Sequence, residues 1–388
     1  MSPRYCLPRV QGRGAGLGNE LVPWARAHLM AQVLGARLLP PAFGLNQRGY
    51  ARHFGTIRCD WLLHRVLQQT LPVVEFTEAD FHTHGGGNVL DAFRRFALAK
   101  GLFDRTAFVV TTEGMWGGYL HVAAARRFVL TTLRSSRYAQ TNLSAIAGRL
   151  DPSKFTVGMH VRLGDFAAPQ PLADYRGKFN VSIPLEWYVR IGLELQGRYG
   201  QAVQFLIASD GTPQQLRPLT EQLPCVLTGD LPHGDCSDLL ALAQSDLLVC
   251  SVSSFSAWAA ALSGAPYLWF EPSLHKHAEG FYSIWGHEPH QQEADGETRR
   301  AIHAWCKRPF LRPRGWPVGM LGGVPAEAMA PLNKRGPGRR LADAAADLVH
   351  YGVVPVRDFA SRTHAEPEPA WAHGASAVVH AQAEAACT

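Results

Sequence analysis

The chain has 388 residues, of which 46% are hydrophobic and 18% are charged. This composition excludes a disordered chain, and the length predicts two domains and a tail. The 38 basic residues exceed the 32 acidic ones by only six, and they form no long run. Such a modest excess suits an anionic small molecule such as a nucleotide, and we expect no nucleic-acid partner.

The cysteines and the apolar segments bear on the compartment. The seven cysteines form no CxxC pair, which favours reduced thiols. The start, MSPRYCLPRV, lacks the apolar segment of a signal peptide, and the longest apolar stretch, AWAAALSGAPYLWF, is short for a bilayer. We therefore expect a cytoplasmic protein without a membrane span.

Residues 1–150 are expected to form a first domain. A glycine-rich turn in GRGAGLGNEL precedes a helical pattern in NELVPWARAHLMAQVLGARLL, and FVVTT predicts a strand. The turn lacks the GxGxxG register of a dinucleotide site. Gly16 and Gly18 still permit close approach of the backbone, and Asn19 is expected at the helix start. The turn thus outlines an anion cradle. The Asp-Pro at 151–152 marks the boundary of the domain.

Strands and helices alternate through residues 151–330, the expected second domain. Strands are predicted in FTVGMHVRL, VQFLIASD, CVLTGD, DLLVCSV and APYLWFE, and helices in LEWYVRIGLELQGRYG, TPQQLRPLTEQL, SDLLALAQ and SSFSAWAAALSG. This order predicts a doubly wound parallel sheet with ligands at the carboxyl ends of its strands. Residues 331–388 are expected to form a partly mobile C-terminal extension.

The segment GMHVRLGDF ends a strand with polar residues. His160 and Arg162 share one face of that strand, and Asp165 follows in the turn. The planar fork of arginine suits a diphosphate because it donates two hydrogen bonds to phosphate oxygens. The alternative is a surface pair of Arg162 and Asp165 beside a core-facing His160.

A second polar turn follows DLLVCSV. Ser253 and Ser254 stand where this strand gives way to a helix, so a hydroxyl, backbone N–H groups and the helix dipole could hold an anion. The alternative is an ordinary N-cap serine. Asp210, at the end of VQFLIASD, is expected in a structural or ribose-side role. The sequence has no DxD, HExxH, P-loop or GxSxG motif, and we expect no metal.

Three of these segments, in this order, resemble one family. GAGLGNELVPWARAHLMAQVLGA is similar to the glycine-rich start of α1,2-fucosyltransferases. GMHVRLGD resembles the H-x-R-x-G/T-D motif of α1,2-, α1,6- and protein O-fucosyltransferases, and SDLLALAQSDLLVCSVSSFSAWAAALSG resembles their last motif. The resemblance covers residues 12–35, 157–166 and 204–264.

This resemblance implies a GT-B fold, with two Rossmann-like domains and the sugar nucleotide in a cleft between them. Arg162 would hold the β-phosphate of the donor and Ser254 the diphosphate. His160 would line the nucleotide site, and Asp238 matches the acidic residue directed at guanine. Asn19, with Gly16 and Gly18, would approach from the other domain. Asp165 is the first choice for a general base. Two departures from the family, Leu163 in place of a second arginine and Glu20 in place of glutamine, question strict GDP-fucose specificity.

The expected function is that of an inverting, metal-independent bacterial glycosyltransferase. It would transfer a fucose-like 6-deoxyhexose from a nucleoside-diphosphate sugar of the GDP-fucose type to a glycan or small-molecule hydroxyl. One alternative is an antibiotic-pathway transferase with another deoxysugar, for example one that transfers dihydrostreptose to an aminoglycoside precursor. Another is a noncatalytic nucleotide-sugar-binding protein. A serine hydrolase built on Ser253 or Ser254 is disfavoured because the nucleophile elbow is absent.

Overall fold

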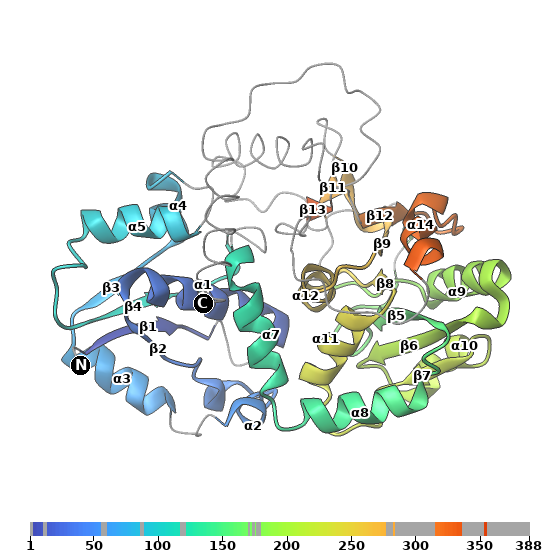
Figure 1. The fold of residues 1–388 in the computed structure, drawn as a ribbon, viewed down its shortest axis with the longest axis horizontal. Coiled ribbons are helices and arrows are strands. Elements are labelled where there is room, and N and C mark those ends of the chain that lie inside the picture. Colours follow the sequence, from blue (N-terminus) through green and yellow to red (C-terminus); the bar gives the residue numbers. More distant parts are fainter. Residues whose placement is uncertain are drawn as a thin grey trace, which may run out of the picture. The chain divides into compact units, whose positions relative to one another are not determined.

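The computed structural model describes residues 3–10, 14–55, 60–85, 89–116, 122–169, 171–172, 175, 180–276, 282–283, 315–335 and 353–354. These residues form two compact units, one ending at Val129 and the other beginning at Leu130. Each unit contains a parallel sheet packed with helices (Figure 1), which confirms the predicted pair of α/β units.

The first unit has a four-stranded parallel sheet in the order β2-β1-β4-β3. Its strands are β1 Arg4–Pro8, β2 Arg37–Leu38, β3 Val73–Glu75 and β4 Phe108–Thr112. Its helices are α1 Leu17–Leu34, η1 Phe43–Leu45, α2 Ala51–Phe54, α3 Asp60–Thr70, α4 Glu78–Thr83, α5 Val89–Ala99 and η2 Ala123–Ala125. The boundary between the two units lies inside the next helix, α7 Arg126–Arg134. All five residues of β4 are buried, as expected for a central parallel strand.

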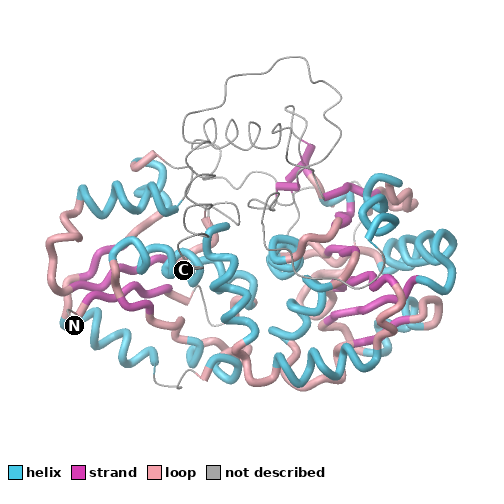
Figure 2. The backbone as a smooth tube through the Cα atoms, viewed as in Figure 1, coloured by secondary structure: helices cyan, strands magenta, loops and turns pink. Residues whose placement is uncertain are grey.

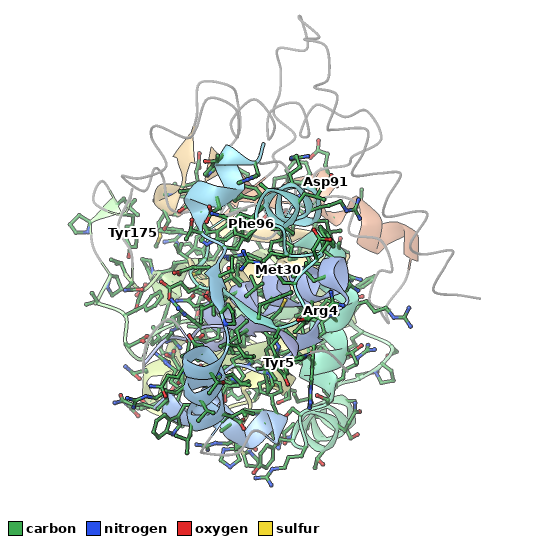
Figure 3. All side chains as sticks on the ribbon, turned by 90° about the vertical axis from the view of Figure 1, so that its left-hand side faces the viewer. Arg4, Tyr5, Met30, Asp91, Phe96 and Tyr175 are labelled. Atoms are coloured by element: carbon green, nitrogen blue, oxygen red, sulfur yellow. The ribbon has the colours of Figure 1, made fainter. Side chains whose placement is uncertain are left out.

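Helices cover both faces of this first sheet (Figure 2). On one face, Leu67 of α3 packs against a cluster that contains Leu7 and Val109. Alternate residues of a strand point to the opposite face, and there Thr112 meets Arg26 of α1. Met30 of α1 is fully buried in the interior (Figure 3).

The second unit has a six-stranded parallel sheet in the order β12-β9-β8-β5-β6-β7. Its strands are β5 Phe155–Val161, β6 Val203–Ser209, β7 Cys225–Leu227, β8 Leu247–Cys250, β9 Tyr267–Phe270 and β12 Gly315–Val318. When the strands are numbered along the chain and read from β7, this is the order 3-2-1-4-5-6 of a Rossmann sheet. The order in which strands are added reverses between β5 and β8. A separate antiparallel sheet contains β10 His275–Lys276, β11 Tyr282–Ser283 and β13 Val353–Val354.

The helices of the second unit are α8 Ala139–Arg149, α9 Leu185–Tyr199, η4 Gly200–Ala202, α10 Pro213–Thr220, α11 Asp235–Gln244, α12 Ser254–Leu262, η5 Glu271–Ser273 and α14 Ala326–Arg335. Helix α11 packs against α8 and α12, and α9 packs against α10 (Figure 1). Because parallel crossovers are right-handed and the strand order reverses at β5, these two groups cover opposite faces of the sheet.

The unit boundary lies upstream of the residue 150 expected from the sequence. Helix α8 belongs to the second unit because its Ile146 packs with Leu206 of β6 and Ala241 of α11. An Asp-Pro turn marks the end of a helix, but apolar contact decides to which unit that helix belongs.

The predicted alternation of strands and helices from residue 155 to residue 270 is confirmed. The sequence prediction ended the sheet at APYLWFE, which was wrong, since β12 pairs with β9 from more than forty residues further along the chain. Of the expected C-terminal extension, residues 336–352 and 355–388 lie outside the described residues.

Candidate functional site

The candidate site lies at the carboxyl ends of β5 and β8, where the strand order of the second sheet reverses. His160 is the penultimate residue of β5, and Ser253 and Ser256 follow β8. The Nδ1 atom of His160 lies 2.7 Å from Oγ of Ser256 and 3.4 Å from Oγ of Ser253. The fold thus brings two of the predicted segments into direct contact.

His160 is a buried, neutral imidazole. The Ser251 N–H donates to Oγ of Ser256 at 3.0 Å, so the Ser256 hydroxyl can donate its own hydrogen to Nδ1 of His160. Burial, reinforced by the charge of Arg162, lowers the pKa of His160 to about 3. Where the Ser256 hydroxyl donates to Nδ1, the hydrogen of the neutral imidazole lies on Nε2.

Arg162 lies between two carboxylates. Its Nη2 is 2.6 Å from Oδ1 of Asp165, and its Nη1 is 2.6 Å from Oδ2 of Asp210. The surface pair with Asp165, considered as the alternative in the sequence, is therefore present. Asp210 adds a second anchor, which fixes the direction of the guanidinium although 19% of the side chain remains exposed.

Asp210 also explains the glycine of the HVRLGD segment. Its Oδ1 accepts the N–H of Leu163 at 2.8 Å. A Cβ on Gly164 would overlap the Asp210 carboxylate, so this turn has no room for a side chain. Asp210 thus holds both the turn after β5 and the arginine.

Helix α12 begins at the same edge of the sheet. Ser253 is its N-cap, and Oγ of Ser253 accepts the N–H of Ser256 at 3.2 Å. The simple capping role is therefore confirmed for Ser253. Helix α12 begins just after the turn that follows β8, so the positive end of its dipole lies at this edge of the sheet. An anion beside Arg162 would meet this positive potential.

Asp238 lies apart from this group, in the first turns of α11 and close to Thr228 at the end of β7. In the part of the chain that the structure describes, its buried Oδ1 and the buried Oγ1 of Thr228 have no hydrogen-bond partner. Burial raises the pKa of Asp238 to about 7, the Thr228 hydroxyl opposes this shift, and Asp235 adds to it. Strand β7 is two strands from β5, or about 10 Å.

The glycine-rich turn belongs to the first unit, at the carboxyl end of β1. Gly16, and not Asn19, is the N-cap of α1, and the Leu17 N–H donates to the Tyr50 hydroxyl at 2.8 Å. Asn19 is therefore at the helix start, as predicted, although the N-cap is Gly16, whose backbone is extended with ψ at 155°. Gly18 and Asn19 lie in the first turn of α1. Pro23 lies further along, inside the same helix.

Two residues were missed by the sequence analysis. Thr228 carries no motif and is recognised only by its position beside Asp238. Arg26 of α1 is fully buried and donates to four oxygens at and after the end of β4, namely Oγ1 of Thr112 and the carbonyls of Glu113, Gly114 and Trp116. It also stacks 3.3 Å from the centre of the Trp116 ring. A single arginine in an apolar helix gave no signal of this role.

Two features are absent from the described residues. These residues contain no group of three or more His, Cys, Asp or Glu side chains arranged to hold a metal ion. Among the helices that the structure describes, none has the length and apolar character needed to span a membrane.

No protein-family model matches the chain, and no curated protein matches it. Among solved structures, it is similar to the fucosyltransferase NodZ from Bradyrhizobium, with 16% identity over 68% of this chain and 94% of that chain and a TM-score of 0.42. The NodZ alpha-1,6-fucosyltransferase soaked with GDP-fucose is 17% identical over 69% of this chain and 95% of that chain, with a TM-score of 0.43.

A third similar structure is POFUT1 in complex with GDP-fucose, with 12% identity over 70% of this chain and 98% of that chain and a TM-score of 0.42.

Proposed function

We propose that this protein is a glycosyltransferase that takes a fucose-like 6-deoxyhexose from a GDP-fucose-type donor and transfers it to an acceptor hydroxyl. The observation that carries this proposal is the contact of His160, two residues before Arg162, with Ser253 and Ser256 at the start of α12, at the point where the strand order of the Rossmann sheet reverses. Ligands of such sheets bind at the carboxyl ends of the strands at this point.

The donor diphosphate would lie between Arg162 and the first turn of α12. When the glycosidic bond breaks, the leaving nucleoside diphosphate gains negative charge, and a fixed guanidinium and a helix N-terminus stabilise it without reorganisation. These groups can do so without a metal ion. Attack by the acceptor hydroxyl on the face opposite the diphosphate inverts the anomeric centre.

His160 would serve the diphosphate as a neutral donor. Its Nδ1 is engaged with Ser256, and the hydrogen on Nε2 is left for a ligand. A neutral imidazole stays uncharged through the reaction, so its role is to orient the donor rather than to transfer a proton.

The base of the nucleotide would lie over the ends of β6 and β7. An extended nucleoside diphosphate is long enough to reach across the two strand spacings between Arg162 and Asp238. The buried Oδ1 of Asp238 is an acceptor without a hydrogen-bond partner among the described residues, and guanine presents N–H donors to such a group. This pairing favours a guanine nucleotide.

Calorimetric titration with GDP, dTDP and UDP, each with and without EDTA, tests the proposal. We expect GDP to bind most tightly, EDTA to have no effect, and Asp238→Ala to remove the preference for GDP. A preference for dTDP would move the function towards transfer of another deoxysugar. Failure of all three nucleotides to bind would overturn the proposal.

A further inference from the structure

One face of α8 follows the loop between β7 and α11, residues 228–234, along its whole length. This face consists of the N-cap Tyr138 and of Asn142, Ile146 and Arg149 of the helix, spaced four, four and three apart as one side of a helix requires. All belong to the second unit, and the loop ends at the helix that carries Asp238.

Arg149 holds the beginning of this loop. Its Nη1 and Nη2 donate to the two carboxylate oxygens of Asp230 at 2.8 and 2.7 Å, and Nη1 also donates to the carbonyl of Leu227 at 3.2 Å. The hydrogen bonds between the two side chains raise the pKa of Arg149 and lower the pKa of Asp230. The bidentate geometry fixes the direction of the loop as it leaves β7.

Asn142 holds the other end. This side chain is 2% exposed, and its Nδ2 donates to the carbonyl of Pro232 at 2.9 Å and to Oγ of Ser237 at 3.1 Å. The Ser237 hydroxyl in turn donates to the carbonyl of Gly234 at 3.0 Å. Asn142 therefore ties the last residues of the loop to the first turn of α11.

Between these two anchors the contacts are apolar or aromatic. Leu231 packs against the cluster that contains Ile146. The ring of His233 lies 4.5 Å from that of Tyr138 and has a φ of 53°, a left-handed conformation that a non-glycine residue keeps only where its surroundings enforce it.

The loop is important because it borders the carboxylate of Asp238. A Cβ on Gly234 would lie 3.0 Å from the carboxylate oxygens of Asp238, so a small shift of the loop would close the space beside this carboxylate. Thr228, at the other end of the loop, carries the hydroxyl that lies close to Asp238. The separation of these two groups depends on the shape of the loop, and α8 sets that shape.

We propose that Asn142 and Arg149 are positioning residues that fix the β7–α11 loop for recognition of the nucleotide base, so that α8 determines base selectivity without touching the ligand. This inference rests on the proposed function, since it needs a nucleotide at the strand ends. It predicts that substitution of either residue weakens recognition of the base and leaves the affinity for the diphosphate group unchanged.

The test compares GDP with inorganic pyrophosphate, which lacks the base, in calorimetric titrations of the wild-type chain, Arg149→Ala and Asn142→Ala. We expect each variant to bind GDP about five- to ten-fold more weakly, as for the loss of one or two hydrogen bonds, with pyrophosphate binding unchanged. Arg149→Lys should recover only part of the loss because it cannot form the bidentate pair. Arg217→Ala, which breaks the exposed pair with Glu221 on α10, is the matched control.

Amide hydrogen exchange gives a second readout. Residues 228–237 should lose protection in Arg149→Ala and Asn142→Ala while β5 and α12 keep theirs. Unchanged GDP affinity in both variants, or an equal loss for GDP and pyrophosphate, overturns the inference and leaves the proposed function intact. A wild-type chain that binds pyrophosphate but shows no preference among nucleotide bases overturns the inference. A wild-type chain that binds neither GDP nor pyrophosphate overturns both the inference and the proposed function.

Discussion

The Nη1 atom of Arg162 lies 2.6 Å from Oδ2 of Asp210, and the other oxygen of that carboxylate accepts the N–H of Leu163. One side chain thus holds both the arginine and the backbone turn that carries it. Because the guanidinium is oriented before any ligand arrives, it can stabilise a diphosphate without being ordered during binding.

Substitution of Arg162 by alanine should reduce kcat/KM for sugar transfer about 100-fold, because it removes one charged donor at the leaving group. Arg162→Lys should recover only part of the activity, since an ammonium cannot form the planar fork. Steady-state kinetics with the donor identified by calorimetry makes the measurement, with Arg217→Ala as the control. Full activity in Arg162→Ala would show that Arg162 does not bind the phosphate.

Asp165 is exposed and occupies one side of the Arg162 fork. In the absence of donor it therefore competes with a phosphate, and Asp165→Asn should tighten GDP binding about three- to five-fold. The contrasting hypothesis, that Asp165 is the general base, predicts an unchanged Kd and a kcat lowered about 100-fold. Calorimetry and single-turnover kinetics on the same variant separate the two roles.

Asp238 should make stability depend on pH. Its folded-state pKa is raised from 3.8 to about 7, so between these values the folded protein holds a proton that the unfolded chain has released. The free energy of unfolding should therefore fall as the pH rises from about 4 to about 7, by at most about 4 kcal/mol. Urea titrations of Asp238→Asn, which stays neutral, should lack this component. Parallel pH profiles of variant and wild type would contradict the assignment.

The same carboxyl group should make base recognition depend on pH. A guanine N–H needs the ionised form of Asp238 as its acceptor, so GDP affinity should rise as the pH passes through about 7. The ratio of wild-type to Asp238→Asn affinities cancels the ionisation of the phosphates themselves. A ratio that does not change between about pH 6 and pH 8 counts against Asp238 as the base-recognising residue.

A fluorophosphonate probe should label neither Ser253 nor Ser254. His160 has a pKa of about 3 and directs Nδ1 at Ser256, so it cannot activate a serine as a base near neutral pH. Mass spectrometry of the treated protein gives the answer, with a known serine hydrolase as the positive control. Labelling at either residue would revive the hydrolase hypothesis.

Arg26→Met should destabilise the first unit by about 3 kcal/mol or more, because four oxygens lose a charged donor and three of them are backbone carbonyls of the loop after β4. Arg37→Met, at an exposed position of β2, is the control and should change stability by less than about 0.5 kcal/mol. Urea unfolding measures both. Equal midpoints for the two variants would show that the carbonyls find other donors.

The elements around the strand ends could be predicted from the sequence. VQFLIAS and LLVC are continuous apolar runs, as strands buried on both faces must be, and the polar residues that follow them mark the functional edge. The N-cap of α12 was equally visible, because Ser253 stands directly before an apolar helix. These features are local, and neighbouring residues fix them.

The residues that complete the site could not be predicted. Asn142 has no signature because it acquires its role from Pro232, 90 residues further along the chain. Thr228 acquires its role from Asp238 on the next helix, which no local motif announces. The boundary at Val129 and the pairing of β12 with β9 have the same origin, since burial against distant segments decides both.

By itself, the sequence determined the class of fold, the succession of strands and helices from residue 155 to residue 270, and the places where polar residues follow buried strands, because periodicity and turn chemistry are local. Only the tertiary structure decided that Arg162 is shared by two carboxylates, that His160 meets Ser256, and that α8 holds the loop before Asp238. Those contacts depend on strand order and on helix packing, which local sequence does not encode.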